Sequence, residues 1–248
     1  MSKTPPILST VTRIPTGVKG FDELVHGGLV KNSVVLVQGD TGTTKTIFCL
    51  EYLYKGASIY DEPGIFISFS ESESAIVQHA SAFGWDLEEL KKKKKFAFVK
   101  YSPHEVVNVL SEGGGSIRDT IESIGAKRLV IDSLTAYALF FENKYKANES
   151  ILNLFEMLRD WNTTALVTAE VSVGIDHRRE ASLGFLTDGI INFYHFRRGK
   201  EYEILRAIEV VKMRDTKHNE DINLFEIEKD GIKIIGGINA ANKKIPSK

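Results

Sequence analysis

Short apolar runs alternate with segments of helical periodicity along the first two-thirds of the chain. Residues 33–38 are rich in valine and lead into Gly39, a pattern typical of a buried strand that enters a tight turn. Residues 46–57 then place apolar side chains at helical spacing, which predicts a helix directly after that turn. The same patterns predict further strands at 64–69, 96–99, 128–132 and 164–169, and further helices at 74–83, 105–110, 116–124 and 150–161.

The pattern changes after residue 189. Successive segments are typical of strands joined by turns, with no helical pattern between them. Alternating strands and helices followed by a β-rich end predict an α/β fold, in which helices flank a mainly parallel central sheet and antiparallel strands extend it. The strands expected in this C-terminal extension are 190–196, 202–213, 222–227 and 232–235.

The domain organisation follows from length and from the ends of the chain. A chain of 248 residues is long enough for one large α/β domain and short for two. We place that domain at residues 13–235. Residues 1–12 are expected to be an irregular lead-in, because Pro5 and Pro6 disfavour a helix, and residues 236–248 a flexible, mildly basic tail.

Composition excludes several classes of protein. With 32 basic and 33 acidic residues the formal net charge is −1, so binding of nucleic acid would need a local basic patch. A single cysteine, Cys49, excludes an internal disulfide framework. No apolar stretch approaches the ~20 residues of a membrane span, and the N-terminus lacks the apolar core of a secretory signal. We therefore expect a cytoplasmic protein that does not associate with membranes.

The turn after the first strand carries a near match to a phosphate-binding loop. Residues 39–46 are GDTGTTKT, against the consensus G-x-x-x-x-G-K-[ST]. In such loops backbone N–H groups surround a phosphate, the lysine neutralises phosphate oxygens and the final hydroxyl binds Mg²⁺. The residues expected to bind ATP are Gly39, Asp40, Thr41, Gly42, Thr43, Thr44, Lys45 and Thr46, with Thr46 on the metal and Lys45 also assisting catalysis.

Thr44 stands where the consensus has its second glycine. Glycine lets the backbone approach a ligand without a Cβ in the way. A β-branched threonine either crowds the loop and weakens binding, or turns its hydroxyl outward without harm. Both outcomes remain open at the level of the sequence.

Asp132 ends the apolar strand at 128–132. The carboxyl end of a parallel strand beside the phosphate loop is where a second acidic residue of such a site belongs. We expect Asp132 to hold the Mg²⁺ shell through water, while an ordinary cap of a helix or loop is the simpler alternative.

Several ordered motifs together resemble the KaiC-like branch of the RecA superfamily of ATPases, over roughly residues 13–235. The entry segment TGVKGFDEL at 16–24, followed by Gly27 and Gly28, is similar to the family's own entry motif. The phosphate loop follows it in the expected order. The other matching segments are IDSLT at 131–135, DGII at 188–191 and KMRDTKH at 212–218.

The resemblance implies a ring of subunits, often a hexamer, with ATP at the interfaces. It implies that Lys212 and Arg214 reach the γ-phosphate bound by the neighbouring subunit, where cations stabilise charge in the transition state. A solvated strand end is the alternative for both residues. His218 is implied to lie near the same nucleotide.

The family's pair of glutamates after the second strand is incomplete here. The family segment is Phe-Glu-Glu-Ser, whereas residues 69–72 are FSES, so that Ser70 replaces the first glutamate and Glu71 remains. In the family these carboxylates polarise the attacking water, and a serine has no useful pKa for that task. Glu71 is therefore the expected catalytic carboxylate, and Glu73 is a poorly spaced substitute.

Two basic segments bear on DNA binding. Lys91–Lys95 is either a solvated helix end before the strand at 96–99 or a patch for an anionic partner. Arg178 and Arg179 lie in a polar segment, 172–183, that is either a plain exposed loop or, as in RecA-like rings, a loop that faces the central channel.

These observations predict an ATP-binding protein that hydrolyses ATP slowly to ADP and phosphate and acts as a ring-forming regulator of an unidentified protein client. A DNA-binding protein similar to recombinase paralogues is one alternative. A catalytically inactive phosphate-loop scaffold is the other, and the departures at Thr44 and Ser70 favour it.

Overall fold

The computed structural model describes residues 11–102, 105, 114–171, 184–198 and 203–238. Most of the helix predicted at 105–110, the segment 172–183 with Arg178 and Arg179, and most of the predicted tail lie outside these residues. Within the described part, no helix is long and apolar enough to cross a membrane.

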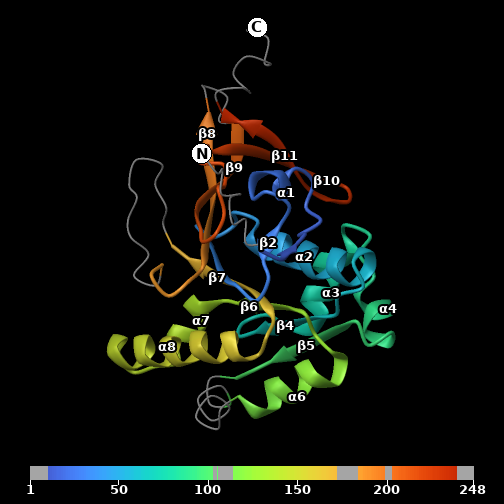
Figure 1. Ribbon diagram of the computed structural model, residues 1–248, viewed down its shortest axis with the longest axis vertical. Coiled ribbons are helices and arrows are strands. Elements are labelled where there is room, and N and C mark those ends of the chain that lie inside the picture. Colours follow the sequence, from blue (N-terminus) through green and yellow to red (C-terminus); the bar gives the residue numbers. More distant parts are fainter. Residues whose placement is uncertain (1–10, 103–104, 106–113, 172–183, 199–202, 239–248) are drawn as a thin grey trace, which may run out of the picture.

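One large sheet runs through the molecule (Figure 1). Within the described residues it has nine strands in the order β11-β10-β9-β8-β3-β7-β6-β4-β5. The six strands from β8 to β5 in that order are parallel, and β9, β10 and β11 continue the sheet through antiparallel pairs. The strands are β3 (Val34–Gly39), β4 (Gly64–Ser68), β5 (Phe96–Lys100), β6 (Arg128–Asp132), β7 (Thr164–Glu170), β8 (Gly189–Arg198), β9 (Glu203–Met213), β10 (Asn223–Glu228) and β11 (Gly231–Gly237).

This arrangement confirms the predicted parallel sheet with an antiparallel extension. All nine strands were expected, and most ends agree to within two residues. β11 continues to Gly237, two residues past the predicted end of that strand. The sequence patterns missed a small antiparallel ribbon of β1 (Arg13–Ile14) and β2 (Leu29–Val30), because two residues are too few for a periodicity.

Helices cover both faces of the sheet. Val35 and Val37 of β3 pack into a core shared with α1 to α4, whereas Val34 and Leu36 pack on the opposite face against α6 to α8. This division follows from the alternation of side chains along a strand, and a strand covered on both faces is apolar throughout. The helices are α1 (Phe21–Leu24), α2 (Lys45–Ile59), α3 (Glu73–Ser81), α4 (Leu87–Lys92), α6 (Gly115–Ile124), α7 (Leu134–Ala138) and α8 (Lys144–Asp160).

α8 begins six residues before the predicted start at residue 150. Asn143 caps the helix, because its side-chain oxygen accepts a hydrogen bond of 3.0 Å from the backbone N–H of Lys146. In Figure 1, α6 and α8 lie at the opposite end of the molecule from the antiparallel strands.

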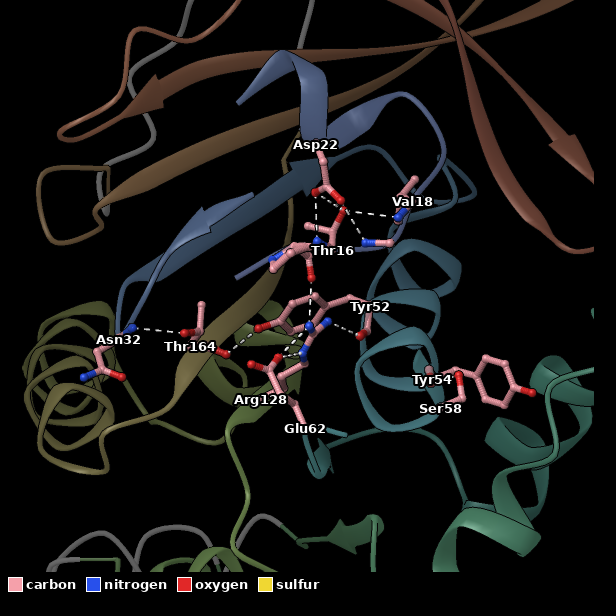
Figure 2. Close-up of polar contacts among 12 residues, drawn as sticks. Thr16, Val18, Asp22, Asn32, Tyr52, Tyr54, Ser58, Glu62, Arg128 and Thr164 are labelled. Atoms are coloured by element: carbon pink, nitrogen blue, oxygen red, sulfur yellow. Dashed lines mark hydrogen bonds and ion pairs between the residues drawn. The ribbon is translucent and has the colours of Figure 1, made fainter. Parts of the chain in front are cut away.

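A buried arginine joins the N-terminal segment to the sheet and to α2 (Figure 2). Arg128 of β6 is fully buried and donates hydrogen bonds of 2.8 Å to the carbonyls of Tyr52 and Pro15 and to the carboxylate of Glu62. Its guanidinium also lies over the ring of Tyr52, 4.6 Å from the centroid. A buried charge paired in this way fixes the position of α2, which begins at the phosphate loop.

Candidate functional site

The carboxyl ends of the parallel strands bring residues 41–46 of the predicted phosphate loop together with Glu71 and Asp132 around one cavity of about 430 Å³, here called the phosphate-loop cavity. β3, β4, β6 and β7 are neighbours in the sheet and run the same way, so their following residues meet at one edge. The residues lining the cavity are Thr41, Gly42, Thr43, Thr44, Lys45, Thr46, Ile47, Ser70, Glu71, His79, Asp132, Ser133, Glu170, Arg206 and Ile227.

Gly39 and Lys45 set the shape of the loop. A Cβ at Gly39 would lie 2.3 Å from the backbone oxygen of Phe193 in the neighbouring strand, so only glycine fits there. The Lys45 ammonium donates hydrogen bonds of 2.9 Å to the carbonyls of Gly39 and Asp40. Burial lowers the pKa of Lys45, and the carboxylates of Glu170 and Asp132 oppose that shift.

Thr44 has the backbone conformation of the glycine that it replaces. Its φ is 80° and its ψ 13°, which is the left-handed region that glycine occupies without strain. The loop therefore keeps a glycine-like backbone with a β-branched residue in it. No side-chain hydrogen bond caps α2 at this residue, so the strain is not offset by a cap.

Asp132 lies between two hydroxyl groups. Thr46 donates a hydrogen bond of 2.7 Å to one carboxylate oxygen, and Thr168 of β7 donates one of 2.6 Å to the other. Carboxylate and hydroxyl oxygens are the donors that Mg²⁺ prefers, so Thr46 and Asp132 fit this ion. Nothing in the strand pattern distinguished Thr168, because its role appears only once β7 is placed beside β6.

Glu71 reaches the same cavity from the turn after β4. The hydroxyl oxygen of Ser68 accepts hydrogen bonds from the backbone N–H groups of Glu71, at 2.9 Å, and of Ser70, at 3.3 Å. This turn fixes the backbone before α3 begins. Glu73 instead forms an ion pair with Lys91 and does not line the cavity.

Glu170, Arg206 and Ile227 are among the cavity residues that were not predicted. Glu170 ends β7 as Asp132 ends β6, so the strand-end rule that selected Asp132 would also have selected it. Arg206 and Ile227 belong to β9 and β10, and they reach the cavity only because the antiparallel strands fold beside it. The pattern of apolar and polar residues within β9 and β10 does not predict that these strands lie beside the cavity.

Lys212 and Arg214 do not line the phosphate-loop cavity. The Lys212 ammonium donates hydrogen bonds to the carbonyls of Gly184, at 2.9 Å, and Thr187, at 2.6 Å. Arg214 pairs with the Asp188 carboxylate at 3.1 Å and lines a different cavity of about 340 Å³. Burial, followed by the nearby Arg214 charge, lowers the pKa of Lys212.

His218 lies on the same segment as these two cations. It is half-buried, and its Nδ1 lies 3.1 Å from the carbonyl of Asn219. Arg13 of β1 anchors this segment, since its guanidinium donates to Thr216 at 2.9 Å and to the carbonyl of Asp215 at 3.1 Å. Within one chain, these three residues thus do not line the phosphate-loop cavity, and Arg214 lines the second cavity.

The lysine run lies at a helix end, as the simpler of its two interpretations predicts. α4 ends at Lys92, and β5 begins at Phe96. Lys93 pairs with Glu89 at 3.1 Å and Lys95 with Asp61 at 2.6 Å. Carboxylates thus neutralise part of this basic surface.

Comparisons with known proteins agree with this geometry. A family model described as "ATPase: KaiC" matches residues 14–238. The circadian clock oscillator protein KaiC of a Nostoc species is 34% identical over 233 residues, which cover 90% of this chain and 44% of that protein. The chain thus spans less than half the length of the curated KaiC proteins that it matches.

Shorter relatives match over most of their length. A UPF0273 protein of Methanocaldococcus jannaschii is 31% identical over 233 residues, covering 89% of this chain and 95% of that protein. The crystal structure of a KaiC-like protein from Pyrococcus horikoshii superposes with a TM-score of 0.80 at 35% identity, covering 90% of this chain and 99% of that one. The predicted RecA-like α/β fold is thereby confirmed, and the chain belongs to the KaiC ATPase family.

Proposed function

We propose that the chain binds ATP with Mg²⁺ in the phosphate-loop cavity. The observation that carries this proposal is the Lys45 ammonium, held at 2.9 Å from two loop carbonyls beside the N-terminus of α2. Phosphate oxygens are stronger acceptors than these carbonyls, so the Lys45 ammonium donates its hydrogen bonds to the phosphates when a nucleotide binds. The unpaired N–H groups and positive partial charge of the helix N-terminus attract the same phosphates.

Mg²⁺ is held by Thr46 and through water by Asp132 in this proposal. When bound, the ion neutralises charge on the phosphates. Thr168 keeps the Asp132 carboxylate turned toward Thr46, because it occupies the second carboxylate oxygen. Arg206 and Ile227, on the antiparallel side of the cavity, contact the remainder of the nucleotide.

Hydrolysis is assigned to Glu71, which orients the attacking water. The water oxygen forms a bond to the γ-phosphorus, and the bond from that phosphorus to the bridging oxygen breaks. ADP keeps the electron pair, and the proton of the water passes through Glu71 to solvent. Because Ser70 supplies no second carboxylate and Thr44 strains the loop, turnover is slow. The double variant Thr44→Gly/Ser70→Glu should therefore turn over faster than the parent.

A second subunit completes each site. None of Lys212, Arg214 and His218 lines the phosphate-loop cavity of their own chain, and this supports their action on a nucleotide held by a neighbour. Every subunit then offers a nucleotide on one face and cations on another. Such a head-to-tail contact generates a ring, and a hexamer is the expected size.

Exchange of the Lys212 contacts makes this assembly sensitive to ATP. The ammonium satisfies two carbonyls of its own chain, so it moves to the γ-phosphate only when that anion is present in trans. We infer that the protein acts as an ATP-dependent switch for a protein client, and that the ring is the form that the client recognises.

Mixing two inactive variants tests completion in trans. Glu71→Gln removes the catalytic carboxylate but leaves the cations, and Lys212→Ala/Arg214→Ala does the reverse. Each alone should keep only a small residual rate of turnover, while a mixture at equal concentrations should regain about a quarter of the wild-type rate, because random assembly pairs an intact site with intact cations at that frequency. A mixture as inactive as its components would show that the cations act within one chain or not at all.

The alternatives have different signatures. DNA binding would show a steep loss of affinity with rising salt, but the ion pairs of Lys91, Lys93 and Lys95 leave the lysine run a weak candidate. An inactive scaffold would assemble without regard to ATP. The strained Thr44 and the serine at position 70 are the observations that favour the scaffold.

A further inference from the structure

His79 and Glu71 meet inside the phosphate-loop cavity. The imidazole Nε2 of His79 lies 3.2 Å from Oε2 of Glu71, and both side chains line the cavity. This carboxylate oxygen is buried and makes no hydrogen bond of good geometry with any described residue. The imidazole of His79 is therefore the polar group that the structure places against this oxygen.

The fold sets this distance. Ser68 fixes the backbone of Glu71 through a hydrogen bond of 2.9 Å, and Ser72 then caps α3 by accepting from the backbone N–H of Ala75. His79 follows about two turns into that helix. Side chains of a helix lean toward its N-terminus, so the imidazole of His79 reaches back over the turn that carries Glu71.

The contact compensates for the serine at position 70. A single carboxylate on a half-exposed turn rotates freely unless another group holds it. With Nε2 of His79 against Oε2, the other carboxylate oxygen of Glu71 remains available to the attacking water. The remaining charged groups around the cavity, Lys45, Asp132, Glu170 and Arg206, come from α2, β6, β7 and β9.

We propose that His79 is a positioning residue that holds the Glu71 carboxylate for water activation. This inference rests on the proposed ATP hydrolysis at the site. It predicts that His79 acts on the chemical step and not on nucleotide binding, because its contact is with the carboxylate that orients water.

Steady-state kinetics of three variants tests the proposal. His79→Ala should lower kcat about tenfold with a change in KM for Mg·ATP of less than about twofold, because only the orientation of Glu71 is lost. His79→Gln, whose amide can donate to the same oxygen, should recover most of kcat. Gln78→Ala, an exposed neighbour on α3, is the matched control and should behave as wild type.

A double-mutant cycle separates positioning from general damage. In the Glu71→Gln background, His79→Ala should cause no further loss, since the carboxylate it holds is already gone. Wild-type kcat in His79→Ala, or an equal loss in both backgrounds, would overturn this inference alone. A wild-type protein that binds Mg·ATP without any Glu71-dependent turnover would overturn the proposed hydrolysis as well.

Discussion

The hydroxyl of Thr46 donates a hydrogen bond of 2.7 Å to the carboxylate of Asp132. The two residues lie 86 positions apart in the sequence, and the bond joins the first turn of α2 to the end of β6. It holds the two proposed Mg²⁺ residues together before any nucleotide arrives. The site is thus organised by the sheet, with the helix and the strand end both fixed by their packing.

Thr168 should control how well the protein uses Mg²⁺. Thr168→Val keeps the shape of the buried side chain but removes the hydroxyl that holds Asp132, so the Mg²⁺ concentration for half-maximal nucleotide binding should rise about tenfold. Thr168→Ser keeps the hydroxyl and is the matched control. Equal Mg²⁺ dependence in the valine variant and the wild type would show that Asp132 needs no such support.

Thr44 should limit both stability and affinity. Thr44→Gly relieves the left-handed backbone strain, so the free energy of unfolding should rise by about 1 kcal/mol and Mg·ATP should bind more tightly. Thr43→Gly is the control. It should destabilise the protein, because the Thr43 hydroxyl is lost from its bond to the carbonyl of Asp40. Urea unfolding and calorimetry measure both effects, and a less stable Thr44→Gly protein would refute the strain.

Arg128 should be a main support of α2. Arg128→Met leaves the Glu62 carboxylate and the carbonyls of Tyr52 and Pro15 without their donor, and should lower the free energy of unfolding by about 3 kcal/mol. Arg118→Met removes an exposed ion pair with Glu122 and should cost less than about 0.5 kcal/mol. Similar losses in urea unfolding for both variants would contradict the buried role of Arg128.

Glu51 should make stability depend on pH. Its carboxylate is buried on α2 and accepts a hydrogen bond of 2.8 Å from the backbone N–H of Ile232, and burial raises the pKa of Glu51 to about 7. The folded protein therefore keeps this proton at pH values where the unfolded chain, with a pKa of about 4.3, has released it. The contribution of Glu51 to the free energy of unfolding is therefore fully present below about pH 4.3 and is lost as the pH rises from there through about 7.

Glu51→Gln should remove this dependence, because the amide oxygen still accepts the Ile232 hydrogen bond but never ionises. Relative to wild type, the variant should gain on the order of 3 kcal/mol of unfolding free energy between pH 5 and pH 8. Glu226→Gln is the control. Glu226 is exposed on β10, which pairs with the strand that carries Ile232, and its charge stays in water. If the free energy of unfolding changes with pH in the same way in the wild type and in Glu51→Gln, the burial of a titrating carboxylate is contradicted.

The sequence predicted those parts of the fold and site that depend on local patterns. Lys45 follows a strand and a glycine turn, and Asp132 ends an apolar strand, so both could be placed before the fold was known. In the structure both residues line the phosphate-loop cavity together with Glu71. The start of α8 also has a local signal, because Asn143 is a residue type that favours the N-cap of a helix.

Site residues whose role depends on the order of strands in the sheet could not be predicted from the sequence. Thr168 is one of several buried residues in β7, and its hydroxyl matters only because β6 lies beside it. Arg206 comes from an antiparallel strand whose periodicity gives no sign of the cavity. His79 looks like an ordinary exposed position on a helix until Glu71 is placed next to it.

Equilibrium binding of Mg·ATP to the wild type and to Lys45→Ala tests the central claim most directly. The account predicts micromolar binding by the wild type and at least about tenfold weaker binding by the variant, because charge-assisted hydrogen bonds to the phosphates are lost. Equal affinity in the two proteins, or no binding by the wild type, would contradict the claim that the strained loop around Thr44 binds ATP.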